Sequence, residues 1–317
     1  MITNKLNSFL LLFVLVVLVV FFSIMKPATF FTADNFFTIM RQVSMMGISA
    51  VGMTFVLLVG GLDLSVGTMQ GLVGIWLASF MVDFNIAPPF AVVLVLLIGM
   101  GVGLVNGLII TRLKVSPFIA TLSMMQIVKG FAFLYSNAFP IFGFPQSFQF
   151  LGQGYAFQLI PIPVIIMAVS FIIGWILLSK TYLGRSFYAV GGNEEASHLS
   201  GLNVNRVKMI AYMCSGLTAA VAAVILCSRL NSGQPNAGAG FEFDVITAVI
   251  LGRVSLSGGS GKLSNVLIGV IIIGVLSNGM IIMNISEYLQ WVIKGLVLIA
   301  AVAVDGFEKK APKTLAS

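Results

Sequence analysis

The stretch VLLVGGLDLSVG, residues 56–67, decides the fold because it places two glycines, an acid and a serine between two strongly apolar runs. These runs, at residues 43–60 and 66–82, are close to the ~20 residues that an α-helix needs to cross a ~30 Å hydrocarbon core. The few residues between them leave no room for an ordinary exposed loop. The sequence therefore predicts a helix break at membrane depth, where irregular backbone is tolerated only inside protein or beside a water-filled cavity.

The composition of the whole chain agrees with a membrane environment. Of its 317 residues, 59% are hydrophobic and 9% are charged, against roughly 25% charged in a soluble domain. A water-soluble fold is excluded, and we expect an all-α polytopic membrane protein with one transmembrane domain over residues 1–317. About ten membrane helices, some short or broken, are expected at residues 8–25, 43–60, 66–82, 90–110, 116–135, 161–179, 209–228, 245–256, 264–283 and 288–304.

The distribution of basic residues predicts the orientation. With the N-terminus inside, eleven lysines and arginines fall in inside segments, whereas only Lys26, Arg41 and Arg229 fall outside. This bias places both termini in the cytoplasm. The net charge of +7 is thus explained by membrane topology, and we expect no nucleic-acid partner.

A second glycine-rich break is expected at GRVSLSGG, residues 252–259, which repeats the first break at a spacing of 192 residues. Matched interruptions of this kind are typical of transporters with internal repeats and point to the translocation path. The alternative is that Asp63, Ser65 and Ser257 merely cap helices. The path candidates are Asp63, Ser65, Asn106, Ser255, Ser257 and Asn278.

Two lysines fall inside predicted spans. A charge near the bilayer centre costs ~2.5 to 3.5 kcal/mol on insertion scales, so we expect Lys129 and Lys294 to extend to the outer interface. The alternative is that one of them faces a cavity and pairs with Glu242, Asp244 or Glu287, which are expected at neighbouring outer ends.

Residues 180–208 form the longest connection on the inside, and local signals predict a short helix within it from about Glu194 to Ser200. Asn193 is a good N-cap, two glutamates suit the positive first turn, and Gly201 is placed to end the helix. A solvated connector is the alternative.

Four spaced segments resemble the ribose-type permeases of bacterial carbohydrate ABC importers, within the branched-chain amino acid and sugar permease superfamily. They are GGLDLSVG at 60–67, PFIATL at 117–122, YAVGGNEEASHLSGLNV at 188–204 and LGRVSLSGGSGK at 251–262. The resemblance covers nearly the whole chain. The chain departs from the family at Arg253, where a second glycine is usual.

The resemblance implies a permease of the inner membrane that pairs with itself or a sister subunit. It further implies a periplasmic sugar-binding protein outside and an ABC ATPase subunit in the cytoplasm. Arg41 and Arg229 are candidates for docking the binding protein. The candidates for ATPase coupling are Gly192, Asn193, Glu194, Glu195, Ala196, Leu199 and Gly201.

The expected function is import of a monosaccharide, with a ribose-like pentose first and allose or another hexose, a polyol or an autoinducer-type furanose as alternatives. The chain has no G-x-x-x-x-G-K-[ST] loop, so ATP hydrolysis is expected from a partner. A secondary transporter or channel is the first rival. A membrane enzyme is the second, although scattered acids and one histidine do not suggest catalysis, and no cofactor or metal is expected.

Overall fold

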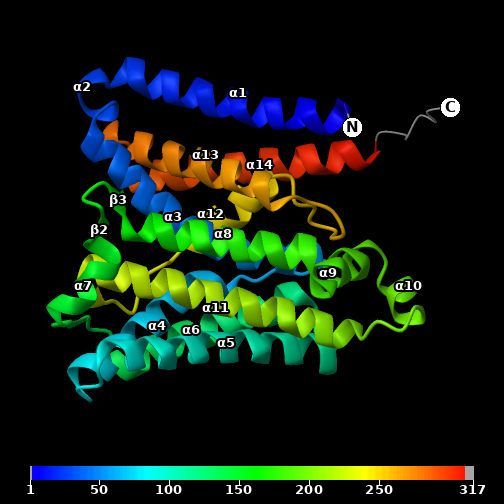
Figure 1. The fold of residues 1–317 in the computed structure, drawn as a ribbon, viewed down its shortest axis with the longest axis horizontal. Helices are drawn as coiled ribbons and strands as arrows, with labels where there is room; N and C mark the ends of the chain where they lie inside the picture. The colour runs from blue at the N-terminus through cyan, green and yellow to red at the C-terminus, as the bar shows by residue number, and fades with distance from the viewer. Residues whose placement is uncertain (1, 311–317) are drawn as a thin grey trace.

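The computed structural model describes residues 2–310, which form a helical bundle with a few very short strands (Figure 1). The helices are α1 (Ile2–Met25), α2 (Pro27–Phe30), α3 (Ala33–Leu58), α4 (Ser65–Val82), α5 (Pro88–Arg112), α6 (Pro117–Ser136), α7 (Gln146–Gln153), α8 (Ile162–Lys180), α9 (Tyr182–Gly192), α10 (Glu194–Leu199), α11 (Val204–Leu230), α12 (Phe241–Leu251), α13 (Leu263–Ile282) and α14 (Glu287–Lys310). The strands are β1 (Ile141–Phe142), β2 (Tyr155–Ala156), β3 (Ile160–Pro161) and β4 (Ser232–Gly233); β1 pairs with β4 and β2 with β3, both antiparallel.

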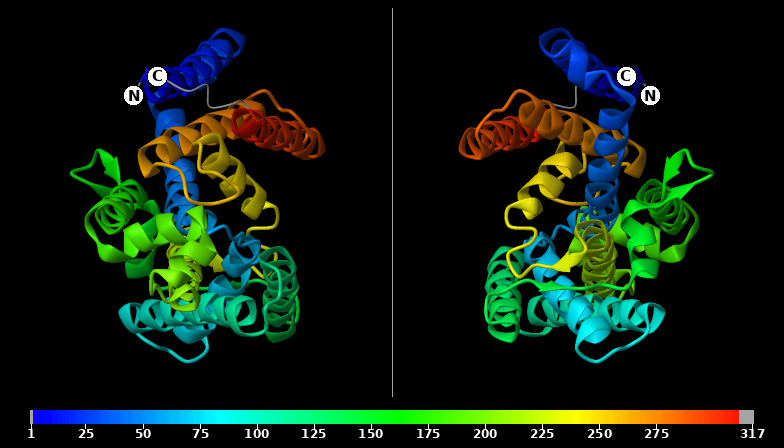
Figure 2. Two further views of the ribbon diagram at one scale, coloured as in Figure 1. Left: turned by 90° about the vertical axis from the view of Figure 1, so that its right-hand side faces the viewer. Right: turned by 90° about the vertical axis from the view of Figure 1, so that its left-hand side faces the viewer.

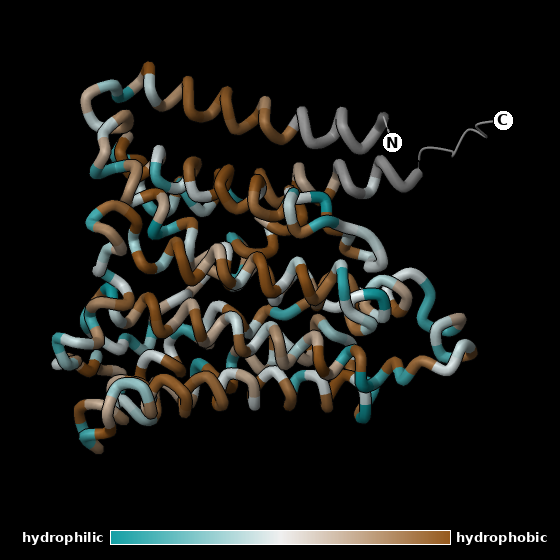
Figure 3. Tube along the Cα trace, viewed as in Figure 1, coloured by the Kyte–Doolittle hydropathy of each residue, from teal (hydrophilic) through white to brown (hydrophobic). Residues whose placement is uncertain are grey.

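Seven helices in the described part of the chain are long and apolar enough to cross a membrane, namely α3, α4, α5, α6, α8, α11 and α13. The all-helical membrane class is thus confirmed. A helix overlaps each of the ten predicted segments, but the ten-span topology with both termini inside goes beyond this result and stays a prediction. Figure 3 shows hydrophobic residues along the long helices and more hydrophilic residues at the two ends of the bundle.

The predicted helix starts were late in two places because capping signals were overlooked. Helix α3 begins ten residues before the predicted segment, after the Thr32 side chain accepts a hydrogen bond from the Asn35 amide at 3.2 Å. Helix α11 likewise begins at Val204, after Asn203 accepts from the Arg206 amide at 3.0 Å. Each cap satisfies an N–H group that the first helical turn leaves free.

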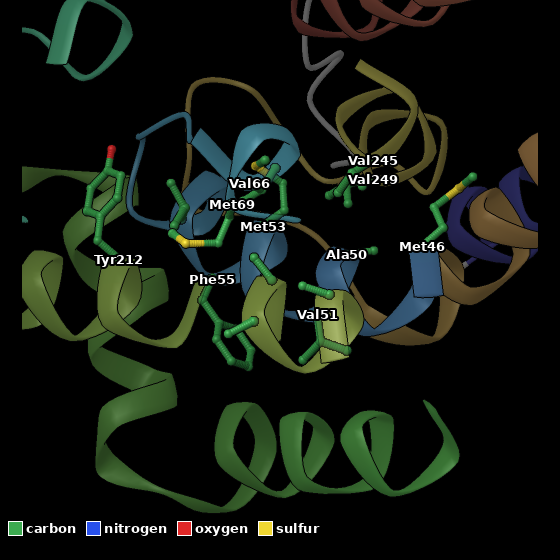
Figure 4. Packing of buried hydrophobic residues seen from close by; sticks show 14 of the residues in the cluster. Met46, Ala50, Val51, Met53, Phe55, Val66, Met69, Tyr212, Val245 and Val249 are labelled. Carbon is green, nitrogen blue, oxygen red and sulfur yellow. The ribbon is translucent and has the colours of Figure 1, made fainter. Parts of the chain in front are cut away.

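The core lies around α3, which contacts α8, α11, α12 and α13. Figure 4 shows side chains of α3, α4, α11 and α12 meeting there, and Met53, Met69 and Val249 are fully buried. On α5, Gly99 and Gly103 let the backbone approach α11, because an added Cβ would lie 2.7 Å from the Gly216 oxygen or 3.0 Å from the Met213 Cα. Small residues on one face of α5 thus allow the backbones of α5 and α11 to pack closely.

The segment predicted as a helix at 245–256 is helical only as far as Leu251, and the chain reaches this helix by a non-helical segment packed along α4. Residues 231–240 run in extended and turn conformation along α4, where Gly233 lies against Gly74 and Gly238 lies against Gly67. Between these two contacts the segment runs about 10 Å along the axis of α4, because each residue of a helix rises 1.5 Å. The chain then turns at Gly240, with φ +82°, into the half-length helix α12. Glycines at 67, 71 and 74 leave the space for this re-entrant backbone.

The two ends of the bundle carry different elements (Figure 1). Helix α7 and the strands β2 and β3 lie at one end, between α6 and α8 in sequence. Helices α9 and α10 project at the other end, where the expected inside connection 180–208 is largely helical rather than a loop.

Candidate functional site

Glycines from three distant parts of the chain meet at one point, which we name the glycine junction. It consists of Gly60, Gly191, Gly192, Gly258 and Gly259. The Gly259 amide donates a hydrogen bond to the Leu58 carbonyl at 2.9 Å. A Cβ added to Gly258 would lie 2.9 Å from the Gly60 nitrogen, and one added to Gly259 would lie 2.7 Å from the Gly192 Cα. Backbone therefore meets backbone directly, with no side chains between.

The junction brings together both predicted helix breaks and the end of α9. Helix α3 ends where the first break begins, and α12 ends where the second break begins. Gly60 at φ +74° and Arg253 at φ +62° are the left-handed residues that terminate these helices. Glycine adopts the left-handed conformation at the lowest energetic cost, which explains why a glycine is usual in the family at the position of Arg253.

The two breaks share local structure, but with a change of register that the sequence alignment missed. At the helix ends, Gly60 corresponds to Arg253, whereas the predicted spacing of 192 residues pairs Gly60 with Gly252. Further on, the Ser65 amide donates to Asp63 Oδ1 at 3.1 Å, and the Ser257 amide donates to Ser255 Oγ at 3.3 Å, which restores the predicted alignment. Both are side-chain turns that stabilise irregular backbone.

The structure brings three of the predicted path residues together. Ser65 Oγ donates to Asp63 Oδ1 at 2.6 Å, and Asn106 Nδ2 donates to Ser65 Oγ at 3.0 Å. All three side chains are at most 1% exposed. This chain of hydrogen bonds ties the start of α4 to α5, within the packed interior of the single protomer.

The other predicted path residues lie apart from this cluster. Ser255 and Ser257 lie in the second break, with their hydroxyl oxygens 3.1 Å apart. Asn278 Nδ2 donates to Asn35 Oδ1 at 2.8 Å and joins α13 to the first part of α3. That these residues line the path stays a prediction.

Two hydroxyl groups that the sequence did not single out complete the first break. Thr121 Oγ1 and the Tyr212 hydroxyl donate to the Leu62 carbonyl at 3.2 and 3.3 Å. An unpaired carbonyl at membrane depth is costly, so these donors allow the break to exist there. Thr121 lies in the PFIATL segment, which was the one sequence signal for it.

The short helix predicted in the inside connection is confirmed as α10. Asn193 Oδ1 accepts from the Ala196 amide at 2.8 Å, and Gly201 takes φ +86° just after the helix. Glu194 pairs with Lys208 of α11 at 2.6 Å. Leu199 is 81% exposed, an unusual state for a leucine beside polar neighbours.

Helix α10 borders a cavity of about 730 Å³ at this end of the protein. The lining residues are Lys114, Glu194, Glu195, His198, Gly201, Leu202, Asn203, Val204 and Asn205. Tyr188 of α9 donates its hydroxyl to the Gly261 carbonyl at 3.0 Å, and burial raises the pKa of this phenol. The neutral hydroxyl thus links α9 to the segment after the second break.

Arg41 and Arg229, the two predicted docking residues, lie at the opposite end. The Arg41 guanidinium lies 4.8 Å from the centre of the Tyr155 ring, and Gly152 of α7 packs against the Arg229 backbone. Gln153 of α7 donates to the Arg229 carbonyl at 3.1 Å. The structure therefore brings both arginines beside α7 and the β2–β3 hairpin; their docking role stays a prediction.

For Lys294 the structure shows the alternative to the prediction, a pairing with a neighbouring acid. Its ammonium group lies 2.6 Å from Asp244 Oδ2, and both side chains are largely buried. The acids lie at helix ends as expected, with Glu242 and Asp244 in the first turn of α12 and Glu287 in the first turn of α14. The Glu242 carboxylate packs against Gly67 of α4, and the Lys129 ammonium lies 6.0 Å from the centre of the Phe133 ring.

The chain is similar to known membrane permeases over nearly its full length. The family model described as "Branched-chain amino acid transport system / permease component" matches residues 35–302. A ribose import permease protein of Bacillus subtilis is 45% identical over 95% of this chain and 92% of its own length. One of Escherichia coli K12 is 43% identical over 93% and 92%. An L-arabinose transport system permease protein of Escherichia coli K12 is 41% identical over 94% and 92%. No solved structure matches the chain.

Proposed function

The chain belongs to the permease component family of branched-chain amino acid transport systems, and on this basis we propose that it is the membrane subunit of an ATP-driven importer for ribose or a similar monosaccharide. It is an inner-membrane protein, as its relatives are. The similarity to an L-arabinose permease keeps other sugars open as alternatives. A ribose-like pentose remains the first choice because the ribose permeases are the more similar relatives.

The structural observation that carries the coupling part of this proposal is the glycine junction. A permease without its own ATPase must receive work from another protein and transmit it to the membrane helices. Helix α9 touches the end of α3 and the second break through Gly191, and α10 follows α9 directly and projects from the bundle. We therefore assign α10 as the coupling element for a cytoplasmic ATPase, with Leu199 as its apolar contact and Glu194, Glu195 and Asn193 as polar ones.

The remaining partners follow from the same assignment. A periplasmic sugar-binding protein docks at the end that carries α7, with Arg41 and Arg229 as its acid-binding contacts. A second permease subunit, identical or related, completes the path. The buried group of Asp63, Ser65 and Asn106 holds the first break in shape beside that path.

The test is uptake by the purified permease reconstituted in liposomes with its ATPase and binding protein. Ribose uptake is expected only with ATP and all three components. Uptake that persists without the ATPase and collapses with an uncoupler would instead identify a secondary transporter.

The role of α10 is tested separately by Leu199→Asp, which places a charge on the exposed position. Co-purification with the ATPase is expected to fall while thermal stability stays unchanged. Leu113, 70% exposed and outside α10, offers the matched control Leu113→Asp. Equal retention of the ATPase by both variants would remove α10 from the interface.

A further inference from the structure

Polar and charged side chains gather on one face of the bundle, inside the span rather than at its ends. The face is formed by α6, residues 231–240, α12 and α14, and Figure 2 shows α12 between α6 and α14 in both views. Exposed or partly exposed polar members are Gln126, Lys129, Gln234, Asn236, Asp244 and Lys294. We name this set the polar face.

Lipid is a costly neighbour for the polar face. Lys129 is the thirteenth residue of the 20-residue helix α6, and Lys294 is the eighth residue of α14. A charge at such depth costs ~2.5 to 3.5 kcal/mol in lipid on insertion scales. In contrast, α8 on the other side of the bundle presents exposed Ile172 and Ile173 at comparable depth. The polar face therefore meets water or another protein.

The charges on this face are partly compensated within the protein. Lys294 pairs with Asp244 at 2.6 Å, and the buried Glu242 lies behind the face, against Gly67. Glu242 is 4% exposed, and its Oε2 has no hydrogen-bond partner among the described residues. A face that carries a neutral ion pair and the exposed amides of Gln126 and Asn236 suits a neutral solute better than an ion.

An aromatic side chain stands within the polar set. Phe243 lies between Glu242 and Asp244 in sequence and is 50% exposed. The C–H side of a sugar ring is apolar and packs on such a ring, whereas its hydroxyl groups need donors and acceptors nearby. Gln126 and Asn236 supply amides, and Lys129 supplies a donor. Small-molecule sites combine apolar contacts with a few placed polar groups in this way.

We propose that the polar face is this protomer's wall of the solute path, and that Gln126, Asn236, Lys129 and Phe243 contact a neutral polyhydroxylated ring there. This assignment rests on the proposed function and adds the location of the path. It differs from the path predicted at the buried cluster around Asp63. Gly67 and Gly71 support the wall, because their missing side chains admit residues 235–242 against α4.

The test places single cysteines at Gln126, Asn236 and Phe243 in a chain carrying Cys214→Ala and Cys227→Ala. The control is Ile173→Cys on α8, which is 59% exposed towards lipid. The assembled importer in nanodiscs is treated with a small anionic methanethiosulfonate reagent, and the labelling rate is measured. Labelling at the three wall positions is expected to be at least tenfold faster than at 173.

A second measurement uses the native cysteines, so that it does not depend on the cysteine-free background. Gln126→Leu and Asn236→Leu are expected to lower ribose uptake at least fivefold, whereas Ile173→Ala leaves uptake unchanged. Wall cysteines that label no faster than position 173 in an importer that still takes up ribose would overturn the assignment. Fast labelling of the wall in an importer that takes up no ribose would overturn the proposed substrate but support the wall.

Discussion

Replacing Gly191 by alanine is the most direct test of how α10 acts on the membrane helices. A Cβ at this position would overlap the Leu58 carbonyl oxygen and come within 2.5 Å of the Gly259 nitrogen. Both neighbours are backbone atoms, so no side-chain rotation relieves the overlap. Gly192→Ala is a matched control, because a Cβ there has no atom within 4 Å.

The two variants share the same gain in helix propensity but differ in strain. Overpacking costs typically 1–3 kcal/mol, and contact with backbone on two sides places Gly191→Ala near about 3 kcal/mol. The gain of at most about 1 kcal/mol from replacing glycine in a helix leaves a net loss of about 2 kcal/mol. Gly192→Ala keeps only the gain. We expect the first variant to separate α9 from the helix breaks.

The assay is ATP hydrolysis and ribose uptake by the same reconstituted complex, together with the thermal midpoint of the permease. Gly191→Ala is expected to lower the sugar transported per ATP about tenfold, whereas Gly192→Ala matches the wild type. Uptake per assembled complex corrects for any loss of folded protein. If Gly191→Ala transported as much sugar per ATP as Gly192→Ala, direct transmission through the glycine junction would be refuted.

Three further predictions test individual contacts. Arg253→Gly is expected to be more stable than Arg253→Ala by about 1 kcal/mol. Both variants lose the arginine side chain, but only glycine accepts φ +62° without strain. Denaturation of the two purified variants measures this difference in stability. Gly201→Ala, at φ +86° with open space around it, is expected to cost about 1–2 kcal/mol and to weaken co-purification with the ATPase. Lys294→Met leaves the Asp244 carboxylate unpaired and is expected to lower stability by about 1–3 kcal/mol, and Asp244→Asn added to it is expected to recover part of the loss. Equal thermal midpoints for the single and double variants would contradict the last prediction.

Local signals were sufficient where the structure is decided within a few residues. Asn193 and Gly201 predicted both ends of α10, because a cap and a left-handed terminator act on their own helix. The glycine pair at 60–61 likewise predicted the first break. The Lys294–Asp244 pair was foreseen only as an alternative, since a sequence does not show which helices are neighbours.

Features decided by distant segments could not be predicted in the same way. Residues 231–240 read as an outer loop, because asparagine, proline and glycine are usual in loops. Their entry along α4 depends on the space at Gly67, Gly71 and Gly74, which lies far away in sequence. Glycines at this spacing on one helix face admit a helix or an extended segment equally well. The meeting of five glycines from three parts of the chain at the glycine junction likewise depends on tertiary packing.

Helix α12 connects the two proposed sites. Its C-terminal end leads into Gly258 and Gly259 at the glycine junction, and its N-terminal end carries Phe243 and Asp244 on the polar face. Eleven hydrogen-bonded residues form a rod of about 16 Å, so a displacement of one end moves the other. The preceding segment is held mainly by isolated turns and by β4, so it yields more easily than the helix. On the proposed function, a half-length helix joined to extended chain would transmit motion from the ATPase side and change the wall without moving a complete span.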